Sequence, residues 1–122
     1  MTYVIFLSLA PSATAQLTRP GVMDAVMKAL RDGRTPAVEP LTALGLPGDF
    51  ARLFVERLRY LLELREAGSL LAAGPFADLK DGMYVCIVPD ERDARRIVEE
   101  DPFYRAGHIE PVFTVRPWLA AL

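Results

Sequence analysis

A short segment near the N-terminus constrains the fold most, because it is apolar on both faces of a strand. One face carries Tyr3, Ile5, Leu7 and Leu9, and the other carries Val4 and Phe6. Successive side chains of a strand point to opposite sides of the sheet, so residues 2–9 predict a strand that is buried on both sides. Such a strand belongs in the middle of a sheet.

Two amphipathic segments predict helices. Apolar side chains recur at helical spacing over residues 49–67, and Asp49 is the expected N-cap of this helix. A shorter helix is expected to follow Asp90, which would cap it, and to end before Pro102.

Three further strands complete the pattern. Residues 69–76 and 82–88 predict two short strands joined by a hairpin loop, and residues 108–116 predict a last strand. The order is then strand, helix, strand, strand, helix, strand. This is the βαββαβ order of the ferredoxin-like fold, which is an α+β fold.

Residues 11–48 form a long insertion after the first strand. Within it, residues 20–30 place apolar side chains at helical spacing, with Pro20 suited to the first turn and Gly33 to the stop. We therefore expect one inserted helix inside a long connection, and a connection of this length in a compact domain is usually functional or poorly ordered. The whole chain, residues 1–122, is expected to form a single domain.

The two helices of this fold cover only one face of the sheet. The strands at residues 2–9 and 82–88 are apolar on both sides and are central in this topology, so the other face needs a cover. A second copy of the chain is the simplest one, and we expect a homodimer. The alternative is that the insertion at residues 11–48 folds back over that face.

Composition excludes several classes of function. A net charge of −2 gives no reason to expect a nucleic-acid partner or an anionic membrane surface. No apolar run approaches the roughly 20 residues that span a bilayer, and no basic residue precedes the apolar N-terminal segment as in a secretory signal. A cytoplasmic protein is the expectation. The only cysteine, Cys86, lies in an apolar strand and is expected to be buried and structural.

No cofactor or metal site is predicted. The chain lacks a glycine-rich turn between a strand and a helix, which a nucleotide site would need. One histidine and one cysteine, far apart in sequence, do not form a metal-ligand pattern.

The second half of the chain contains a set of short motifs in a distinctive order. They are Tyr60-Leu61, Gly68, Ala73-Gly74-Pro75-Phe76, Asp101-Pro102-Phe103 and Arg116-Pro117-Trp118. Together these motifs resemble those of the YCII-related family over roughly residues 57–118. The resemblance implies a dimeric α/β barrel, in which two ferredoxin-like sheets pack face to face. It also implies an acid/base site formed by a helix histidine and the aspartate of the Asp-Pro-Phe motif.

The aspartate of that pair is present as Asp101, but the position of the histidine is occupied by Arg57, eleven residues before Gly68. Arginine does not titrate near neutral pH and cannot take over the role of a histidine. Arg57 falls on the apolar stripe of its helix, where a charge needs a partner. Asp101 is the natural partner. The pair is then either a structural ion pair or a site in which Arg57 holds an anionic group of a substrate.

Three other residues are candidates for the same cleft. His108, the only histidine, begins the last predicted strand and could approach Asp101 in a catalytic role, although a histidine at a strand end is more often structural. Tyr60 follows Arg57 by three residues and could contact a substrate with its hydroxyl. Asp78 matches an acidic position of the family and is a second candidate for substrate binding, but turn formation explains it equally well.

Two functions remain open at this point. The first is a cofactor-free lyase or isomerase that acts on a small, anionic organic molecule, with Asp101 as the acid/base and Arg57 as the anion-binding group. The second is a non-catalytic module that binds a ligand or a protein, in which the acid/base pair of the family has been lost.

Overall fold

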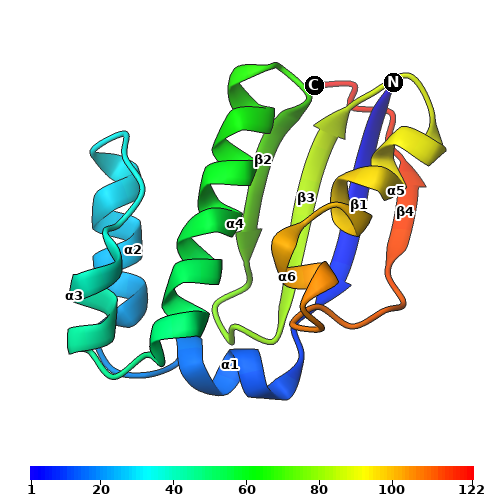
Figure 1. The fold of residues 1–122 in the computed structure, drawn as a ribbon. Helices are drawn as coiled ribbons and strands as arrows, with labels where there is room; N and C mark the ends of the chain where they lie inside the picture. Colours follow the sequence, from blue (N-terminus) through cyan, green and yellow to red (C-terminus); the bar gives the residue numbers. More distant parts are fainter.

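The computed structural model describes residues 1–122 and shows an α+β fold with one four-stranded antiparallel sheet. The strands are β1 (Thr2–Ser8), β2 (Leu70–Pro75), β3 (Asp81–Ile87) and β4 (Thr114–Pro117). The helices are α1 (Pro11–Leu17), α2 (Val22–Arg31), α3 (Val38–Ala43), α4 (Gly48–Glu66), α5 (Glu91–Glu99) and α6 (Pro102–Arg105). Figure 1 shows their arrangement.

The sheet has the strand order β2-β3-β1-β4, which places β1 and β3 in the centre. All neighbouring strands are antiparallel, and Ile5 of β1 pairs with Tyr84 of β3 on one side and with Val115 of β4 on the other. This is the predicted ferredoxin-like arrangement, and the central position of the strand at residues 2–9 is confirmed.

The two faces of the sheet differ sharply in how they are covered. Helices α4, α5 and α6 lie across one face (Figure 1), where Ile5 and Cys86 are completely buried in the hydrophobic core. The opposite face, which we call the open face, carries Val4, Phe6 and Ile87 in alternation with these buried residues. Phe6 is 41% exposed and Ile87 is 44% exposed there. A large apolar side chain at the centre of a sheet is normally covered.

The insertion contains three helices, not the single helix expected from the sequence. The expected helix at residues 20–30 is α2, and the additional ones are α1 and α3. Both are short, with seven and six residues, so they lack the repeated apolar spacing that reveals a longer helix. α2 and α3 lie beside α4, beyond the edge strand β2 (Figure 1), and leave the open face bare. The alternative in which the insertion covers that face is therefore wrong for this chain.

The sequence predicted the N-cap of α5 correctly and the N-cap of α4 incorrectly. Asp90 caps α5 as predicted, with its Oδ1 accepting a hydrogen bond from the backbone N–H of Asp93 at 2.9 Å. Asp49 does not cap α4, because the helix begins one residue earlier, at Gly48, and the Asp49 carboxylate pairs with Arg52 instead. A negative charge in the first turn still suits the helix dipole.

The last strand is shorter than predicted, since β4 begins only at Thr114. Before it, the chain makes a single bridge between Ile109 and Leu9. Pro111 has no N–H to donate to a strand neighbour, which accounts for the interruption. No helix of the chain is long and apolar enough to cross a membrane.

Candidate functional site

Helix α4 directs a charged side chain into the protein interior at Arg57. The buried side of this helix is otherwise apolar, and its buried residues are Phe50, Ala51, Phe54, Val55, Arg57 and Leu58. Arg57 is only 9% exposed. A guanidinium this deep needs both hydrogen-bond acceptors and a counter-charge.

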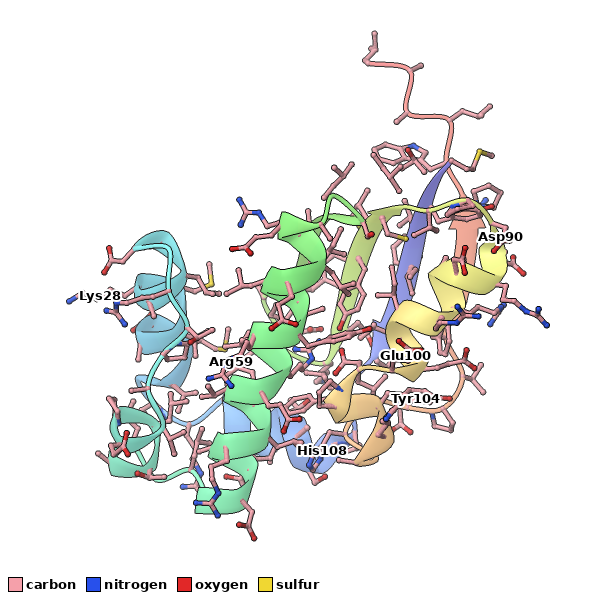
Figure 2. All side chains as sticks on the ribbon, turned by 45° about the horizontal axis from the view of Figure 1, so that its top comes forward. Lys28, Arg59, Asp90, Glu100, Tyr104 and His108 are labelled. Carbon is pink, nitrogen blue, oxygen red and sulfur yellow. The ribbon has the colours of Figure 1, made fainter.

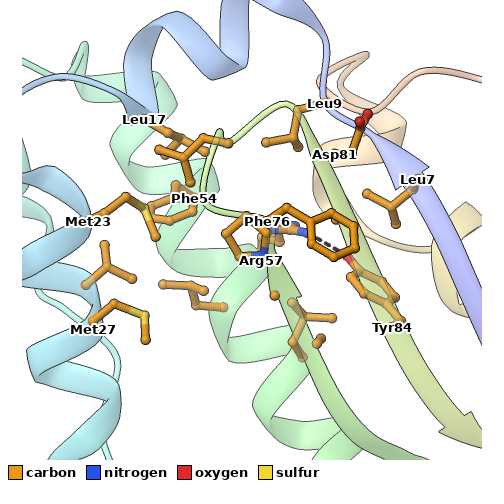
Figure 3. Close-up of a pocket in the computed structure, with 18 of the residues that line it drawn as sticks. Leu7, Leu9, Leu17, Met23, Met27, Phe54, Arg57, Phe76, Asp81 and Tyr84 are labelled. Atoms are coloured by element: carbon orange, nitrogen blue, oxygen red, sulfur yellow. Dashed lines mark hydrogen bonds between the residues drawn. The ribbon is translucent and has the colours of Figure 1, made fainter.

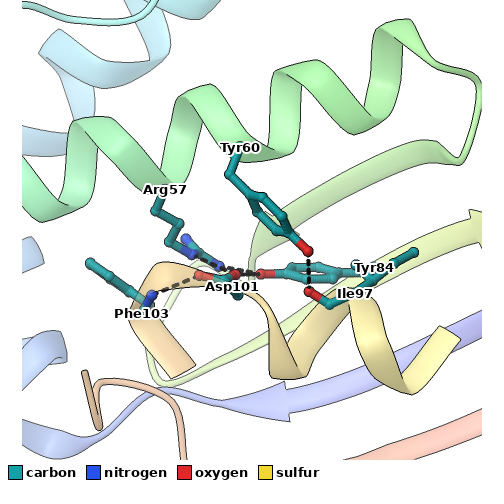
Figure 4. A network of polar contacts seen from close by, with 6 residues as sticks. All are labelled: Arg57, Tyr60, Tyr84, Ile97, Asp101 and Phe103. Carbon is teal, nitrogen blue, oxygen red and sulfur yellow. Dashed lines mark hydrogen bonds and ion pairs between the residues drawn. The ribbon is translucent and has the colours of Figure 1, made fainter. Parts of the chain in front are cut away.

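Asp101 provides the counter-charge, as predicted. It is the N-cap of α6 and is completely buried, with 0% exposure. Its two carboxylate oxygens have different hydrogen-bond donors (Figure 4). Oδ1 accepts a hydrogen bond from the backbone N–H of Phe103 at 2.8 Å, and Oδ2 accepts one from Arg57 Nε at 3.2 Å. The cap therefore fixes the carboxylate in the orientation that meets the arginine.

Tyr84 is a third member of this cluster, and the sequence analysis missed it. Its hydroxyl donates to Asp101 Oδ2 at 2.8 Å and accepts from Arg57 Nη2 at 2.5 Å. A signal was present in the strand alternation, because Tyr84 shares a face of β3 with the buried Cys86. Because this face of the sheet is covered by the helices, the Tyr84 side chain points toward α4, and its hydroxyl meets Arg57 there.

The environment fixes the protonation states of two of these groups. Burial, the largest influence, acts to lower the pKa of Arg57, but the contacts with Tyr84 and Asp101 outweigh it and raise the pKa. Burial also raises the pKa of Tyr84. Arg57 is thus a permanent cation, held 4.9 Å above the centre of the Phe103 ring, and Tyr84 is a neutral phenol.

A cavity of about 430 Å³ lies directly beside Arg57 and Tyr84. Its walls come from α2, α4, β1 and the β2–β3 hairpin, and most of the side chains that line it are hydrophobic (Figure 3). Met23 and Met27 of α2 lie on the wall opposite the arginine (Figure 3), and Val26 of the same helix also lines the cavity. Asp101 does not line this cavity. The inserted helix α2 is therefore part of the site, which no sequence pattern indicated.

Arg57 has hydrogen-bonding capacity that the protein does not use. Its acceptors within the protein are reached through Nε and Nη2, and Nη1 has none. Since every fully buried side-chain nitrogen or oxygen of the protein has a partner, Nη1 is not fully buried. Arg57 also lines the cavity, and an unpaired guanidinium N–H is a donor for a ligand that accepts hydrogen bonds.

The structure does not bring Tyr60 to the cavity. Its hydroxyl donates to the backbone carbonyl of Ile97 at 2.7 Å, toward α5 (Figure 4). Burial raises the pKa of Tyr60. The residue belongs instead to a shallow charged groove on the outer surface between α4 and α6, together with Glu100 and Arg105. The three-residue step from Arg57 turns its side chain to a neighbouring sector of the helix.

Asp78 and His108 also lie outside the cavity lining. Asp78 is exposed, and its Oδ1 accepts a hydrogen bond from the backbone N–H of Lys80 at 2.9 Å, which is turn formation. His108 packs edge-on against the rings of Phe50 and Phe103, each with a centroid distance of 5.1 Å. Burial lowers the pKa of His108. No group of three or more His, Cys, Asp or Glu side chains is placed to hold a metal ion.

Comparisons with known proteins identify the family and support the fold. A family model described as the YCII-related domain matches residues 51–119. Among solved structures, the chain is similar to 5-chloro-2-hydroxyhydroquinone dehydrochlorinase (TftG) from Burkholderia phenoliruptrix AC1100, in complex with 2,5-dihydroxybenzoquinone. The TM-score is 0.56 at 16% sequence identity, and the match covers 97% of this chain and 93% of that chain. This likeness concerns the fold. No curated protein matches the sequence.

Proposed function

Because this chain belongs to the YCII-related family, we propose that it is a homodimeric protein that binds a small organic molecule in the cavity beside Arg57. The observation that carries the proposal is a buried cation, with Nη1 free of any protein acceptor, at the wall of a mostly apolar cavity. Binding sites for small molecules have this composition, with apolar walls and a few polar groups that orient the ligand. The volume of about 430 Å³ is in the usual range for such sites.

The proposed dimer covers the open face of the sheet. Val4, Phe6 and Ile87 would then be buried against the same face of a second copy, in a two-fold contact. The dimeric α/β barrel that the family resemblance implies supports this arrangement. We also propose that residues 1–122 form one domain, because α2 and α3 contribute Val26 and Leu41 to the same hydrophobic core as the sheet.

A second candidate is catalysis by proton transfer, as in a cofactor-free lyase or isomerase. One observation favours it: Tyr84 is among the residues that line the cavity, and its hydroxyl hydrogen-bonds to Asp101. Asp101 is completely buried behind Tyr84 and Arg57, so it would act as the acid/base only through the tyrosine hydroxyl. In this mechanism the Tyr84 oxygen would take a proton from the carbon next to a ligand carbonyl while its own proton passes to Asp101, and Arg57 would stabilise the enolate oxygen that forms. The reverse transfer, from Asp101 through Tyr84, would return a proton to the ligand.

Binding is tested with a pair of variants on α2. Met27→Trp places a bulky ring in the cavity, whereas Lys28→Trp adds the same ring on the exposed side of the helix (Figure 2). Small carbonyl compounds with an aromatic body should raise the melting temperature of the wild type and of Lys28→Trp, and should leave that of Met27→Trp unchanged. Equal shifts in all three proteins would contradict binding in this cavity.

Catalysis is tested by hydrogen exchange in a bound ketone. In D₂O, a proton-transfer enzyme would exchange the hydrogens next to the ligand carbonyl, which proton NMR follows directly. Exchange by the wild type that is lost in Tyr84→Phe, while binding persists, would support the catalytic form. Exchange that is no faster than in buffer would leave binding as the function.

A further inference from the structure

We infer that the ligand of this cavity is an uncharged molecule with a carbonyl-type oxygen, and not an anion. This inference depends on the proposed function, because it specifies which chemistry the same cavity accepts. It replaces the anionic ligand that an inward-facing arginine suggests from the sequence alone. The reason is the distribution of charge around Arg57.

The positive charge of Arg57 is already compensated. Arg57 Nε lies 3.2 Å from Asp101 Oδ2, and the carboxylate is completely inaccessible to solvent. Tyr84 bridges the two charges with one hydrogen bond to each. The cluster as a whole is therefore neutral, and its attraction for an additional negative charge is small.

The rest of the cavity offers no second cation. Apart from Arg57, the only charged side chain in the lining is Asp81, which is negative and accepts a hydrogen bond from Ser8 Oγ at 2.7 Å. A carboxylate ligand in contact with Arg57 would thus share one guanidinium with Asp101, inside an apolar cavity. Removing an anion from water without a counter-charge is strongly unfavourable.

A carbonyl oxygen avoids this cost and still accepts a hydrogen bond. Arg57 Nη1, which has no acceptor within the protein, would form the stronger, charge-assisted type of bond with such an oxygen. The body of the ligand then contacts the apolar wall formed by Met23, Val26 and Met27. Two of these side chains are methionines, which adapt their shape to varied partners. The site thus suits an uncharged ketone, ester or amide with an apolar or aromatic body.

Three probes of nearly identical shape test the inference. They are 4-phenyl-2-butanone, 3-phenylpropanoate and butylbenzene, which present a ketone, a carboxylate and a hydrocarbon at the same position. Dissociation constants are measured by protein-observed NMR titration at pH 7 with the wild-type protein. The ketone should bind about tenfold more tightly than the carboxylate, and more tightly than the hydrocarbon. A carboxylate that binds as tightly as the ketone would overturn the inference.

The buried charge itself is tested with Asp101→Asn, which removes the compensating charge and nearly preserves the shape. With Arg57 no longer neutralised, the carboxylate probe should gain affinity relative to the ketone, by about tenfold or more. Glu100→Gln, at the exposed adjacent position, is the control and should keep the wild-type preference. An unchanged preference in a folded Asp101→Asn protein would contradict the inference.

The outcomes also separate this inference from the proposed function. If Asp101→Asn does not fold, the dissociation constants of the three probes for the wild-type protein still test the inference. If none of the probes binds the wild type, both the inference and the binding function fail. If the carboxylate binds best in the wild type and Met27→Trp abolishes its binding, the cavity is a binding site and only the inference about charge is wrong.

Discussion

Arg57 of α4 and Asp101 at the start of α6 form a buried ion pair across 44 positions of sequence, with Nε and Oδ2 at 3.2 Å. The pair is one side of a three-residue cluster that Tyr84 completes from β3. Through these hydrogen bonds the cluster connects helix α4, the start of helix α6 and strand β3. Two of its members, Arg57 and Tyr84, also line the mostly apolar cavity.

Removing one member of the ion pair should destabilise the protein strongly. Arg57→Leu leaves the Asp101 carboxylate buried without its cation, which typically lowers the free energy of unfolding by about 3–5 kcal/mol. Arg59→Leu, on the exposed side of the same helix (Figure 2), is the control and should change it by less than about 0.5 kcal/mol. Urea denaturation followed by circular dichroism measures both. Similar, small losses in the two variants would show that the pair is not needed for stability.

The tyrosine hydroxyl should have a smaller but measurable effect. Tyr84→Phe removes one donor to Asp101 and one acceptor from Arg57, and we expect a loss of about 1–3 kcal/mol. In the control, Tyr104→Phe, the lost bond is a long 3.3 Å contact to the carbonyl of Pro111 at an exposed position, so the cost should be near zero. Equal effects of the two changes would argue against a cooperative buried cluster.

Histidine protonation should lower stability in mildly acidic solution. Burial lowers the pKa of His108 in the folded protein, whereas the unfolded chain has an ordinary histidine pKa of about 6.5. The unfolded state therefore binds the proton first as the pH falls, and stability decreases below about pH 6.5. His108 is the only histidine, so the difference between wild type and His108→Gln isolates it. Parallel stability profiles between pH 7.5 and 5 would contradict the expectation.

A charge on the open face should separate the proposed dimer. Phe6 is 41% exposed in the single chain, so Phe6→Lys is tolerable there, but it would place two ammonium groups inside a two-fold interface. Light scattering after size-exclusion chromatography should give a dimer mass for the wild type and a monomer mass for this variant. Val112→Lys, at a more exposed position outside the strands, should remain dimeric. A monomeric wild type would refute the proposed assembly.

The sequence was enough to predict those features that depend on the regular spacing of residues within one helix or strand. The apolar side chains on both faces of residues 2–9 predicted the central strand, and the helical repeat of residues 49–67 predicted α4 with Arg57 on its buried side. The Arg57–Asp101 pair followed from the rule that a buried charge needs a partner. These inferences needed only the spacing of residues along one element.

The rest depends on contacts between elements that no local pattern encodes. Tyr84 has the composition of an ordinary strand residue, and only the position of α4 above it gives its hydroxyl two charged partners. α1 and α3 are too short to show a repeat. The cavity is lined by residues of α2, α4, β1 and the β2–β3 hairpin, so it exists only through the packing of these elements against one another. For the same reason Tyr60 was assigned to the site although its hydroxyl points to Ile97.

The methionine methyl groups offer the most direct test of the binding cavity. The four methionines divide naturally, because Met23 and Met27 line the cavity and Met1 and Met83 do not. With ¹³C-methyl-labelled methionine, saturating 4-phenyl-2-butanone should shift the methyl signals of Met23 and Met27 and leave those of Met1 and Met83 in place. Signals of Met23 and Met27 that remain unmoved at saturation would contradict the claim that this cavity binds a small molecule.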